Sequence, residues 1–408
     1  MGRTIKLILK VIKCNKFFFL NGGSERVFFQ ERKFLLNQGV DVVDFSMADP
    51  RNFPSHYSPF FISNIDYQGS VSIFSKIKQG AKFVHSKEAV KKIERIVREE
   101  RPDIAHLHNI YHHLTPSIIP VLKKHGVKIV LTLHDGKLIC PSYLMLRRGE
   151  ICTACEGRYF WKPVTKKCQG SLIRELLLMF EAYWHKWKGN YRLVDLYIAP
   201  SRFIAELISR RIPEEKIRVF HNGVDTDGIN QSIQDEGYGL YFGRISKEKG
   251  IETLLKAHKS FSDNMVLKIV GTGPMEDALR KGYPDVEFLG YKKGEDLNEI
   301  IRKSAFVVVP SECYENCSMV VLEAMSMGKP IIGSRIGGIP EQIEDGRTGF
   351  LFEMGNVGEL AEKMKILTQN KKMRVEYGKA ARKKVESEYS LASHCKGLLG
   401  IYDELLQK

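Results

Sequence analysis

Two carboxylates in the second half of the chain stand at a spacing that could serve one ligand. Glu315 and Glu323 are eight positions apart. Asn316, Cys317 and Ser318 between them are expected to open a helix, where unpaired backbone amides and the helix dipole attract an anion. Glu323 would lie two turns into an otherwise apolar helix, where an unpaired carboxylate is costly. We therefore expect Glu323 to bind ribose hydroxyls and Glu315 to stand beside a reacting sugar; the alternative is two solvent-facing glutamates.

Two cations at a glycine turn form a second group that could do chemistry. Arg244 and Lys249 flank the turn after the apolar stretch Gly239–Phe242, an expected strand. Cations at the carboxyl edge of a parallel sheet can clamp a diphosphate, arginine through its bidentate guanidinium and lysine as a point charge. The alternative is two solvated charges in a loop.

Glycine turns supply candidate phosphate contacts. Gly22 and Gly23 precede an expected helix, and Gly271 and Gly273 follow an expected strand. Glycine lets backbone amides approach a phosphate at a helix N-terminus. The second pair matches only part of the dinucleotide fingerprint and has no obvious acidic partner about 20 residues later, which argues against nicotinamide binding. Taken alone, either pair can also be an ordinary structural turn.

Histidines follow two expected strands of the first half. His134 comes directly after an apolar run, where it could hydrogen-bond a sugar or stabilise charge, although a lone histidine is often structural. A second group clusters after another strand and consists of His106, His108, His112 and His113. Because no carboxylate accompanies this group at a fixed spacing, the sequence argues against a metal site there.

Four of the eight cysteines lie close together, at Cys140, Cys152, Cys155 and Cys168. Four thiolates suit tetrahedral zinc, but only one Cys-x-x-Cys pair is present. Structural zinc and unligated thiols or a redox pair therefore both stay open. Aromatic residues interleaved with lysines follow at 159–161 and 180–187. This stretch could be an acceptor-binding or membrane-facing insertion, or an extra packed helix.

The elements that must position these residues alternate between apolar runs and helical stretches, as in parallel α/β architecture. The first half is expected to hold strands at 5–12, 40–44, 104–108, 128–133 and 196–199, with helices at 24–39, 88–100 and 116–125. The second half restarts the pattern, with strands at 239–242, 267–270, 286–289, 305–309, 330–333 and 349–352, helices at 250–261 and 275–281, and a last helix at about 385–407. The restart places the domain break between 200 and 237, so a ligand cleft is expected between two domains.

Composition sets outer limits on function. The 408 residues exceed the roughly 250–300 that one hydrophobic core holds, which also favours two domains. No apolar run reaches the roughly 18–20 residues that span a bilayer, and the charged start is unlike a signal peptide, so a cytoplasmic protein is expected. The net charge of +15 favours anionic partners such as nucleic acid, a membrane surface or phosphorylated small molecules.

The order and spacing of these segments resemble the retaining GT-B glycosyltransferases of family 4 over nearly the whole chain. The most specific match is 310–333, where Glu315 and Glu323 are similar to that family's pair of glutamates separated by seven residues. Further matches lie at 22–23, 222–225, 243–250, 271–274 and 337–341.

The resemblance implies two doubly wound Rossmann-like domains facing a central cleft. The acceptor-side domain would span 1–200, with the cysteine-rich insertion at about 140–168. The donor-binding domain would span 201–384, and a C-terminal helix at 385–408 would return to the first domain. The implied activity is that of a hexosyltransferase using a UDP- or GDP-sugar, with a saccharide or lipid-linked acceptor, as in cell-surface polysaccharide biosynthesis. A peripheral position on the inner, anionic membrane face would fit such an acceptor.

Residue roles also follow from the resemblance. His134 would contact the transferred sugar together with Glu315, while Arg244 and Lys249 would neutralise the diphosphate and Glu323 would hold the ribose. The other donor contacts would come from Gly22, Gly23, Gly271, Gly273, Asn316, Cys317 and Ser318. No essential divalent ion is expected, because the Asp-Thr-Asp at 225–227 falls where the family has a structural loop.

Two other interpretations remain open at this point. A sugar-nucleotide epimerase or a phosphorylase could share the fold, although the paired glutamates and the Arg244–Lys249 turn argue against it. A zinc-containing nucleic-acid-binding protein would suit the charge and the cysteines. It would concentrate its cations in a stripe, however, whereas here they are dispersed, so we expect no nucleic-acid partner.

Overall fold

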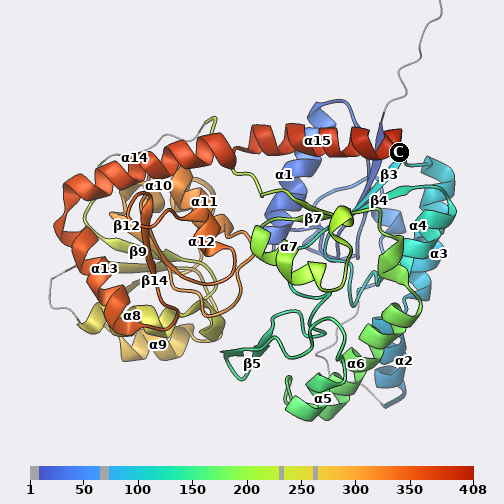
Figure 1. Cartoon of the computed structure of the whole chain (residues 1–408), viewed down its shortest axis with the longest axis horizontal. Helices are drawn as coiled ribbons and strands as arrows, with labels where there is room; N and C mark the ends of the chain where they lie inside the picture. Colours follow the sequence, from blue (N-terminus) through green and yellow to red (C-terminus); the bar gives the residue numbers. More distant parts are fainter. Residues whose placement is uncertain (1–8, 65–72, 229–233, 261–264) are drawn as a thin grey trace, which may run out of the picture.

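The computed structural model describes residues 9–64, 73–228, 234–260 and 265–408, and it contains two six-stranded sheets, one in each half of the chain (Figure 1). The N-terminal sheet has the order β2-β1-β3-β4-β7-β8, and each neighbouring pair is parallel. Its strands are β1 (Lys10–Cys14), β2 (Asp41–Phe45), β3 (Ile104–Leu107), β4 (Lys128–Thr132), β7 (Leu196–Ala199) and β8 (Ile217–Val219). Except in the edge strand β8, nearly all residues of these strands are buried, because helices cover both faces of a parallel sheet.

The C-terminal sheet repeats this design with the order β11-β10-β9-β12-β13-β14. Its strands are also parallel, and they are β9 (Gly239–Phe242), β10 (Leu267–Val270), β11 (Glu287–Phe288), β12 (Phe306–Val309), β13 (Ile331–Ser334) and β14 (Gly349–Phe352). Both sheets reverse their strand order near the centre, and ligands of such folds bind outside the carboxyl ends of the strands at that point. The expected pair of doubly wound domains is confirmed.

Helices flank each sheet. The N-terminal set comprises α1 (Gly23–Asn37), α2 (Ile73–Val84), α3 (Lys87–Glu100), α4 (Ile118–Lys124) and α7 (Arg202–Ser209). The C-terminal set comprises α8 (Ile251–Ser260), α9 (Glu276–Gly282), α10 (Gly294–Lys303), α11 (Met319–Ser326), α12 (Ile339–Gln342) and α13 (Val357–Gln369). Local sequence sets several ends: Ser86 caps α3 by accepting from Ala89 N, and α3 stops at Arg101, whose φ is 49°, just before a proline.

The chain finally crosses back to its first half. The expected single helix at about 385–407 is two helices, α14 (Lys371–Glu388) and α15 (Leu391–Gln407). The break falls at Tyr389 and Ser390, where Val224 N donates to Tyr389 O and Ser390 caps α15. In Figure 1, α14 runs along the C-terminal half and α15 along the N-terminal half. Leu398, Ile401 and other side chains of α15 pack into the core cluster beside β1 and β4.

The first domain runs past residue 200, the end that the resemblance implied, because α7 and β8 follow that point and β8 pairs with β7 in the first sheet. Its last strand ends at Val219, within the range of 200 to 237 that the restart of the pattern gave for the domain break. A short parallel-sheet edge strand such as β8 carries too few apolar residues to be recognised. The first strand also starts later than expected, at Lys10, and residues 1–8 lie outside the described part of the chain.

An insertion separates β4 from β7. It contains the short hairpin β5 (Leu146–Arg147) and β6 (Glu150–Ile151), then α5 (Lys162–Lys166) and the longer α6 (Leu172–Trp187). Five non-glycine residues between 143 and 167 adopt left-handed backbone conformations, so this segment is compact without much regular structure. Among the helices that the structure describes, none is long and apolar enough to cross a bilayer.

Candidate active site

Three loops that leave the carboxyl ends of β4, β9 and β12 come together. The loops after β9 and β12 are in contact, since Glu312 N donates to Glu248 O at 2.9 Å. Gly250 makes this approach possible: a Cβ there would lie 1.8 Å from Pro310 O, and its φ of +67° also favours glycine. The loop after β4 joins them through Asn316 Nδ2, which donates to Leu133 O at 2.5 Å.

Lys249 and Glu315 form an ion pair at this junction. Lys249 Nζ lies 2.6 Å from Glu315 Oε1, and Ser311 Oγ donates to the same oxygen at 2.8 Å. Burial raises the pKa of Glu315, but the Lys249 ammonium and the Ser311 hydroxyl outweigh burial and leave that pKa below its usual value. Attraction to Glu315 raises the pKa of Lys249. Both groups are therefore charged at neutral pH, and the lysine is held at the loop junction.

Arg244 is exposed in the same turn, and within the described residues its guanidinium forms no ion pair. Its backbone oxygen accepts a hydrogen bond from Tyr241 Oη at 2.6 Å. Tyr143 of the insertion lies close enough for the positive charge of Arg244 to lower the pKa of that phenol, although burial raises the pKa overall. A guanidinium with no ion-pair partner among the described residues thus lies between the C-terminal domain and the insertion.

Gly271 and Gly273 support this turn. A Cβ at Gly271 would lie 1.9 Å from Gly243 O, and one at Gly273 would lie 2.1 Å from Ile245 O. Their nearest neighbours are therefore backbone atoms of the turn that carries Arg244. The structure gives both glycines a packing role, and the direct donor contact expected for them stays a prediction.

Asn316 and Glu315 are fixed from several sides. Asn316 Oδ1 accepts from Ser201 Oγ at 2.6 Å, so the amide joins the two domains. Gly338 N donates to Glu315 O at 2.7 Å, and a Cβ at Gly338 would lie only 1.8 Å from Asn316 O. The glycine pair at 337–338, which matched the resembled family, therefore holds the loop that carries Glu315.

The Ser318 amide is not free in this structure. Ser318 N donates to Gln342 Oε1 at 2.9 Å, and Gln342 Nε2 donates back to Ser318 O at 3.1 Å. Cys317 is buried, and its Sγ is 3.6 Å from the same amide nitrogen. A glutamine of α12 thus pairs with the Ser318 amide in this structure, and the contact of that amide with a donor phosphate stays a prediction.

The N-termini of two helices meet beside this loop. A Cβ on Gly23, the first residue of α1, would lie 3.4 Å from Cγ of Met319, the first residue of α11. Gly22 precedes α1 as its exposed cap residue. Since each helix N-terminus carries a partial positive charge and unpaired amides, this junction favours an anion.

Glu323 lies on α11 close to that junction. It is the fifth residue of the helix, so it stands nearer the N-terminus than the expected two turns. Its carboxylate pairs with the guanidinium of Arg26 on α1. Burial raises the pKa of Glu323, and Arg26 only partly offsets that effect. In this structure the partner of the carboxylate is thus Arg26, and the contact with ribose hydroxyls stays a prediction.

His134 directly follows β4 and stacks on another histidine. Its Nε2 lies 2.8 Å from His108 Nδ1. Burial lowers the pKa of His134 to about 3. The ring is therefore neutral at physiological pH and can act as a hydrogen-bond partner but not as a cation.

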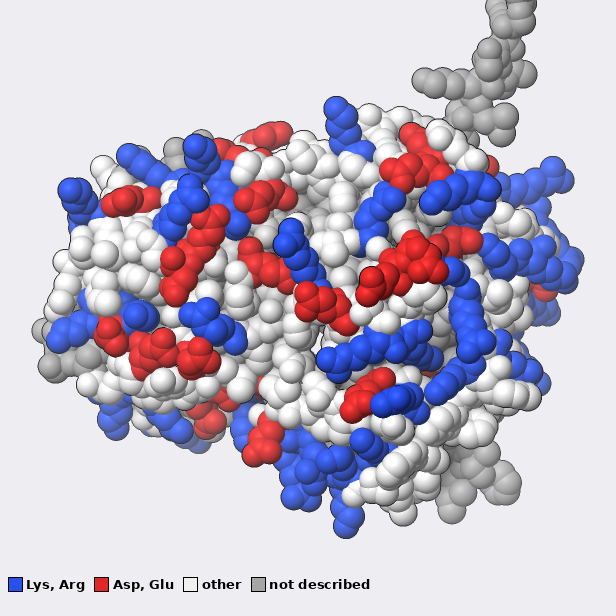
Figure 2. All heavy atoms as spheres, viewed as in Figure 1, with Lys and Arg blue, Asp and Glu red and all other residues white. Residues whose placement is uncertain are grey.

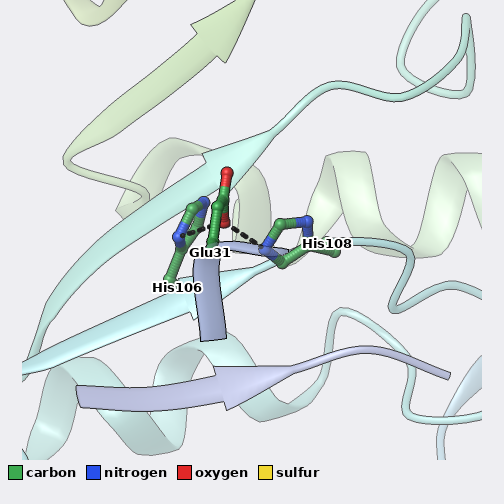
Figure 3. Close-up of side chains that lie close together, drawn as sticks. All are labelled: Glu31, His106 and His108. Carbon is green, nitrogen blue, oxygen red and sulfur yellow. Dashed lines mark ion pairs between the residues drawn. The ribbon is translucent and has the colours of Figure 1, made fainter. Parts of the chain in front are cut away.

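His108 belongs in turn to a buried cluster with His106 and Glu31 (Figure 3). Glu31 Oε2 lies 3.6 Å from His106 Nδ1 and 3.4 Å from His108 Nε2. The carboxylate that the histidines lacked in the sequence thus comes from α1. His112 and His113 do not belong to this cluster of ligand atoms.

A lysine also contacts the carboxylate of this cluster. Lys13 Nζ lies 2.5 Å from Glu31 Oε2, and His394 Nε2 of α15 lies 3.1 Å from Oε1. Burial raises the pKa of Glu31, but Lys13 and the histidines outweigh burial and lower it well below its usual value. An ammonium in contact with the carboxylate opposes a divalent cation. The cluster is therefore a buried polar network that links α1 and α15 to His134.

A pocket opens between the domains beside these groups. Its lining comes from the loop after β4, the insertion, α7 and the loop after β12, and includes His134, Asp135, Tyr143, Phe203, Tyr314 and Asn316. The tyrosines and the phenylalanine give it apolar walls, with polar groups at His134 and Asn316. Such a mixed lining suits a sugar, which presents both hydroxyls and C–H faces.

The four cysteines of the insertion lie near one another without forming a tight group. Cys140 Sγ is hydrogen-bonded to Cys155 and lies 3.1 Å from Ser142 Oγ. Among the described residues, the three ligand atoms that gather within 4.8 Å belong to Glu31, His106 and His108, so no three of these sulfurs do. Zinc at Cys140, Cys152, Cys155 and Cys168 therefore stays a prediction.

The Asp-Thr-Asp segment lies at the domain crossing. Asp225 Oδ1 accepts from Asp227 N at 3.0 Å, and Arg382 Nη2 donates to Thr226 O at 2.7 Å. The neighbouring Val224 forms a β-bridge with Ser390. These contacts make it a structural loop that joins the domain linker to α14.

Comparison with known proteins agrees with this architecture. The chain matches Glycosyltransferase Family 4 over residues 21–227 and Glycosyl transferases group 1 over residues 226–384. An uncharacterized glycosyltransferase of Methanocaldococcus jannaschii is 27% identical over 317 residues, which cover 76% of this chain and 78% of that protein. Spore coat protein SA of Bacillus subtilis is 28% identical over 334 residues, covering 76% and 80%.

Solved structures share the fold at low sequence identity. Sucrose-phosphate synthase from Thermosynechococcus elongatus superposes with a TM-score of 0.74 at 18% identity, covering 98% of this chain and 99% of that one. Anabaena HepE, solved in complex with UDP-glucose, gives a TM-score of 0.66 at 15% identity, covering 97% and 100%. The two parallel-sheet domains, the interdomain loop junction and the family matches lead to one assignment: the chain is a GT-B glycosyltransferase of group 1 and belongs to glycosyltransferase family 4.

Proposed function

We propose that this protein is a retaining hexosyltransferase that moves a sugar from a UDP- or GDP-sugar to a saccharide or lipid-linked acceptor, in the synthesis of cell-surface polysaccharide. The observation that carries the proposal is the loop junction itself. The uncommitted Arg244 and the oriented Lys249 lie on the loop after β9, and the N-termini of α1 and α11 meet where the loop after β12 ends. A leaving diphosphate is the anion that needs such a site.

The donor would lie along the C-terminal domain. Its diphosphate would bind Arg244, Lys249 and the amides around Gly23, and its ribose would reach Glu323. Arg26 now holds that carboxylate but is 42% exposed, so ribose hydroxyls could displace it at little cost. Anabaena HepE, which shares the fold, was solved with UDP and with UDP-glucose, and this supports a nucleotide-sugar donor.

The transferred sugar would occupy the pocket between His134, Asn316 and Tyr314. The acceptor hydroxyl would attack the anomeric carbon on the face from which the diphosphate departs, so the new bond keeps the donor's configuration. The bond from the anomeric carbon to the diphosphate oxygen breaks, and that oxygen takes the acceptor proton. Neutral His134 orients a sugar hydroxyl, and the protein's main contribution is orientation and charge stabilisation.

The reaction is proposed to need no divalent cation. Arg244 and Lys249 supply the charge that a metal would otherwise provide, and the Asp-Thr-Asp segment is engaged with the domain linker. Binding of nucleic acid is not proposed, because Figure 2 shows Lys and Arg mixed with Asp and Glu over most of the visible face rather than in one stripe.

Thermal unfolding with nucleotides tests the proposal. UDP, GDP and their hexose conjugates should be screened without metal and in the presence of a chelator, since a ligand that binds only the folded state raises the melting temperature. We expect one nucleotide series to raise it and Arg244→Ala to abolish that rise. Lys259→Ala, which removes an exposed lysine at the end of α8, is the matched control and should keep the full rise.

The stereochemical part needs a product measurement. Proton NMR of the first product anomer distinguishes retention from inversion directly. An inverted anomer would overturn the retaining mechanism, and turnover of the donor without an acceptor product would favour an epimerase instead.

A further inference from the structure

Helix α6 of the insertion exposes its apolar side and buries its polar side. The exposed face carries Leu172, Ile173, Leu176, Phe180 and Trp187, whose exposed fractions are 60%, 79%, 41%, 55% and 74%. At 3.6 residues per turn, these positions fall within about a third of the helix circumference. The buried positions on the opposite side are Glu175, Leu178, Glu181 and His185. A surface helix of a protein surrounded only by water has the reverse arrangement.

Specific contacts fix this orientation. Lys137 Nζ lies 2.6 Å from Glu181 Oε2, and Gln169 N donates to Glu175 Oε1 at 3.1 Å. On the last turn, His185 Nδ1 is 2.7 Å from an asparagine amide nitrogen. Rotating α6 to bury its apolar face would strip these buried groups of their partners, which is costly. The apolar face of α6 therefore stays exposed on the surface of the protein.

The insertion that carries the exposed face has an excess of positive charge. Residues 140–188 contain nine Lys and Arg and four Asp and Glu, and two of those four, Glu175 and Glu181, are buried. Lys186 near the end of α6 and Lys188 directly after it are exposed, and at 3.6 residues per turn they flank the apolar face on its two sides. In Figure 2, Lys and Arg side chains crowd the lower edge where β5 and α5 lie in Figure 1, next to uncharged side chains along α6.

Aromatic residues complete the pattern. Trp187 ends α6 with Lys188 Nζ 4.5 Å from its ring, and Trp161 at the start of α5 is 47% exposed. Tryptophan prefers the boundary between lipid headgroups and acyl chains, and an amphipathic helix with cations at its edges lies in that boundary. Five exposed apolar side chains on one face of a helix form a patch, and such patches mark interaction sites, unlike single scattered apolar residues.

We propose that α6 docks this protein in the interface of an anionic lipid membrane. The apolar stripe enters the headgroup region, while Lys186 and Lys188, on either side of it, contact lipid phosphates. Because Lys137 lies three residues after His134 and holds Glu181 of α6, the docked helix is tied to the loop of the candidate active site. The interdomain pocket would thereby face a substrate presented at the membrane surface.

Co-sedimentation with vesicles tests this docking directly. The wild-type protein should pellet with vesicles that contain phosphatidylglycerol and stay largely in solution with phosphatidylcholine alone. The variant Ile173→Ser/Phe180→Ser/Trp187→Ser should lose on the order of tenfold in membrane partitioning. Its matched control is Val266→Ser/Tyr291→Ser, which removes apolar side chains 43% and 67% exposed in the other domain and should bind like the wild type.

Charge reversal at the end of the same helix provides a second test of the docking. Lys186→Glu/Lys188→Glu should abolish the preference for anionic vesicles, and all variants should melt within a few degrees of the wild type because the changed residues are exposed. Absence of wild-type binding to anionic vesicles, or full binding by the triple serine variant, would overturn the proposal. So would ultracentrifugation showing that the wild type is a dimer which the triple variant dissociates. Vesicle binding requires no sugar nucleotide, so its failure leaves the proposed transferase function intact.

Discussion

Replacing Lys249 with methionine should destabilise the protein and abolish donor binding, and the two effects can be separated. The variant keeps the length of the side chain but removes the ammonium 2.6 Å from Glu315 Oε1. Glu315 is 17% exposed, so its carboxylate would be left with the Ser311 hydroxyl as its remaining side-chain partner. Breaking a buried ion pair by removing one partner costs about 3–5 kcal/mol. Because Lys249 is 32% exposed, we expect about 2 kcal/mol here.

The loss should depend on pH in a defined direction. In the wild type Lys249 holds the pKa of Glu315 below its usual 4.5, so the stabilisation is present above pH 4.5 and disappears as the pH falls through the lowered pKa. In Lys249→Met, burial is left to raise that pKa. The variant is then most stable when the Glu315 carboxyl is protonated. The difference in unfolding free energy between wild type and variant should therefore widen as the pH rises above 4.5.

The double variant Lys249→Met/Glu315→Gln separates folding from function. It removes both charges, so most of the lost stability should return, which thermal unfolding would show as recovery of roughly 4–8 °C for a domain of this size. The nucleotide-induced rise in melting temperature should stay absent, because the cation is still missing. A double variant as unstable as Lys249→Met would refute the ion-pair reasoning, and a normal nucleotide response would refute the role of Lys249 in the site.

Three further predictions concern other parts of the molecule. Gly250→Ala should destabilise the protein by at least about 2 kcal/mol, because the new Cβ would lie 1.8 Å from Pro310 O. Gly282→Ala should have little effect, because no atom lies within 4 Å of its Cβ. Urea unfolding of both variants measures the difference. Burial lowers the pKa of His134 and His185 to about 3, so both rings are neutral in the folded protein at mildly acidic pH. In the unfolded chain the same rings bind protons below about pH 6.5. Stability should therefore fall as pH drops below that value, by up to about 1.4 kcal/mol per pH unit for each histidine, and calorimetry showing a constant melting temperature down to about pH 5 would contradict this. Elemental analysis should find about one zinc per chain, reduced in Cys152→Ser/Cys155→Ser, and metal-free wild-type protein with an unchanged melting temperature would exclude a structural zinc.

Sequence patterns predicted the scaffold well where the signal is local. Strands such as β7 and β9 were placed at their observed ends because a buried parallel strand is an uninterrupted apolar run. The start of α11 after Ser318 followed from the change of a polar loop into an apolar helix. β8 was missed because three residues at a sheet edge carry no comparable pattern.

Long-range partners could not be predicted from the chain alone. Arg26 pairs with Glu323 across 297 positions, and Glu31 meets His106 and His108 only because α1 packs on the same sheet. The sequence held no signal that would identify Arg26 as the residue that pairs with Glu323. A weak signal was present for α6: a helical repeat with Glu175 and Glu181 facing away from Trp187 is unusual, and it marks a helix whose apolar side is not buried in its own chain.

The account as a whole depends on recognition of a diphosphate by the turn after β9. Calorimetric titration of UDP and uridine, and of GDP and guanosine, into the wild type and Arg244→Ala measures that recognition directly. For the nucleobase that binds, the wild type should prefer the diphosphate over the nucleoside by about two orders of magnitude, equal to roughly 2.7 kcal/mol, and Arg244→Ala should lose most of that preference. If Arg244→Ala keeps the full preference for the diphosphate, the central claim is contradicted.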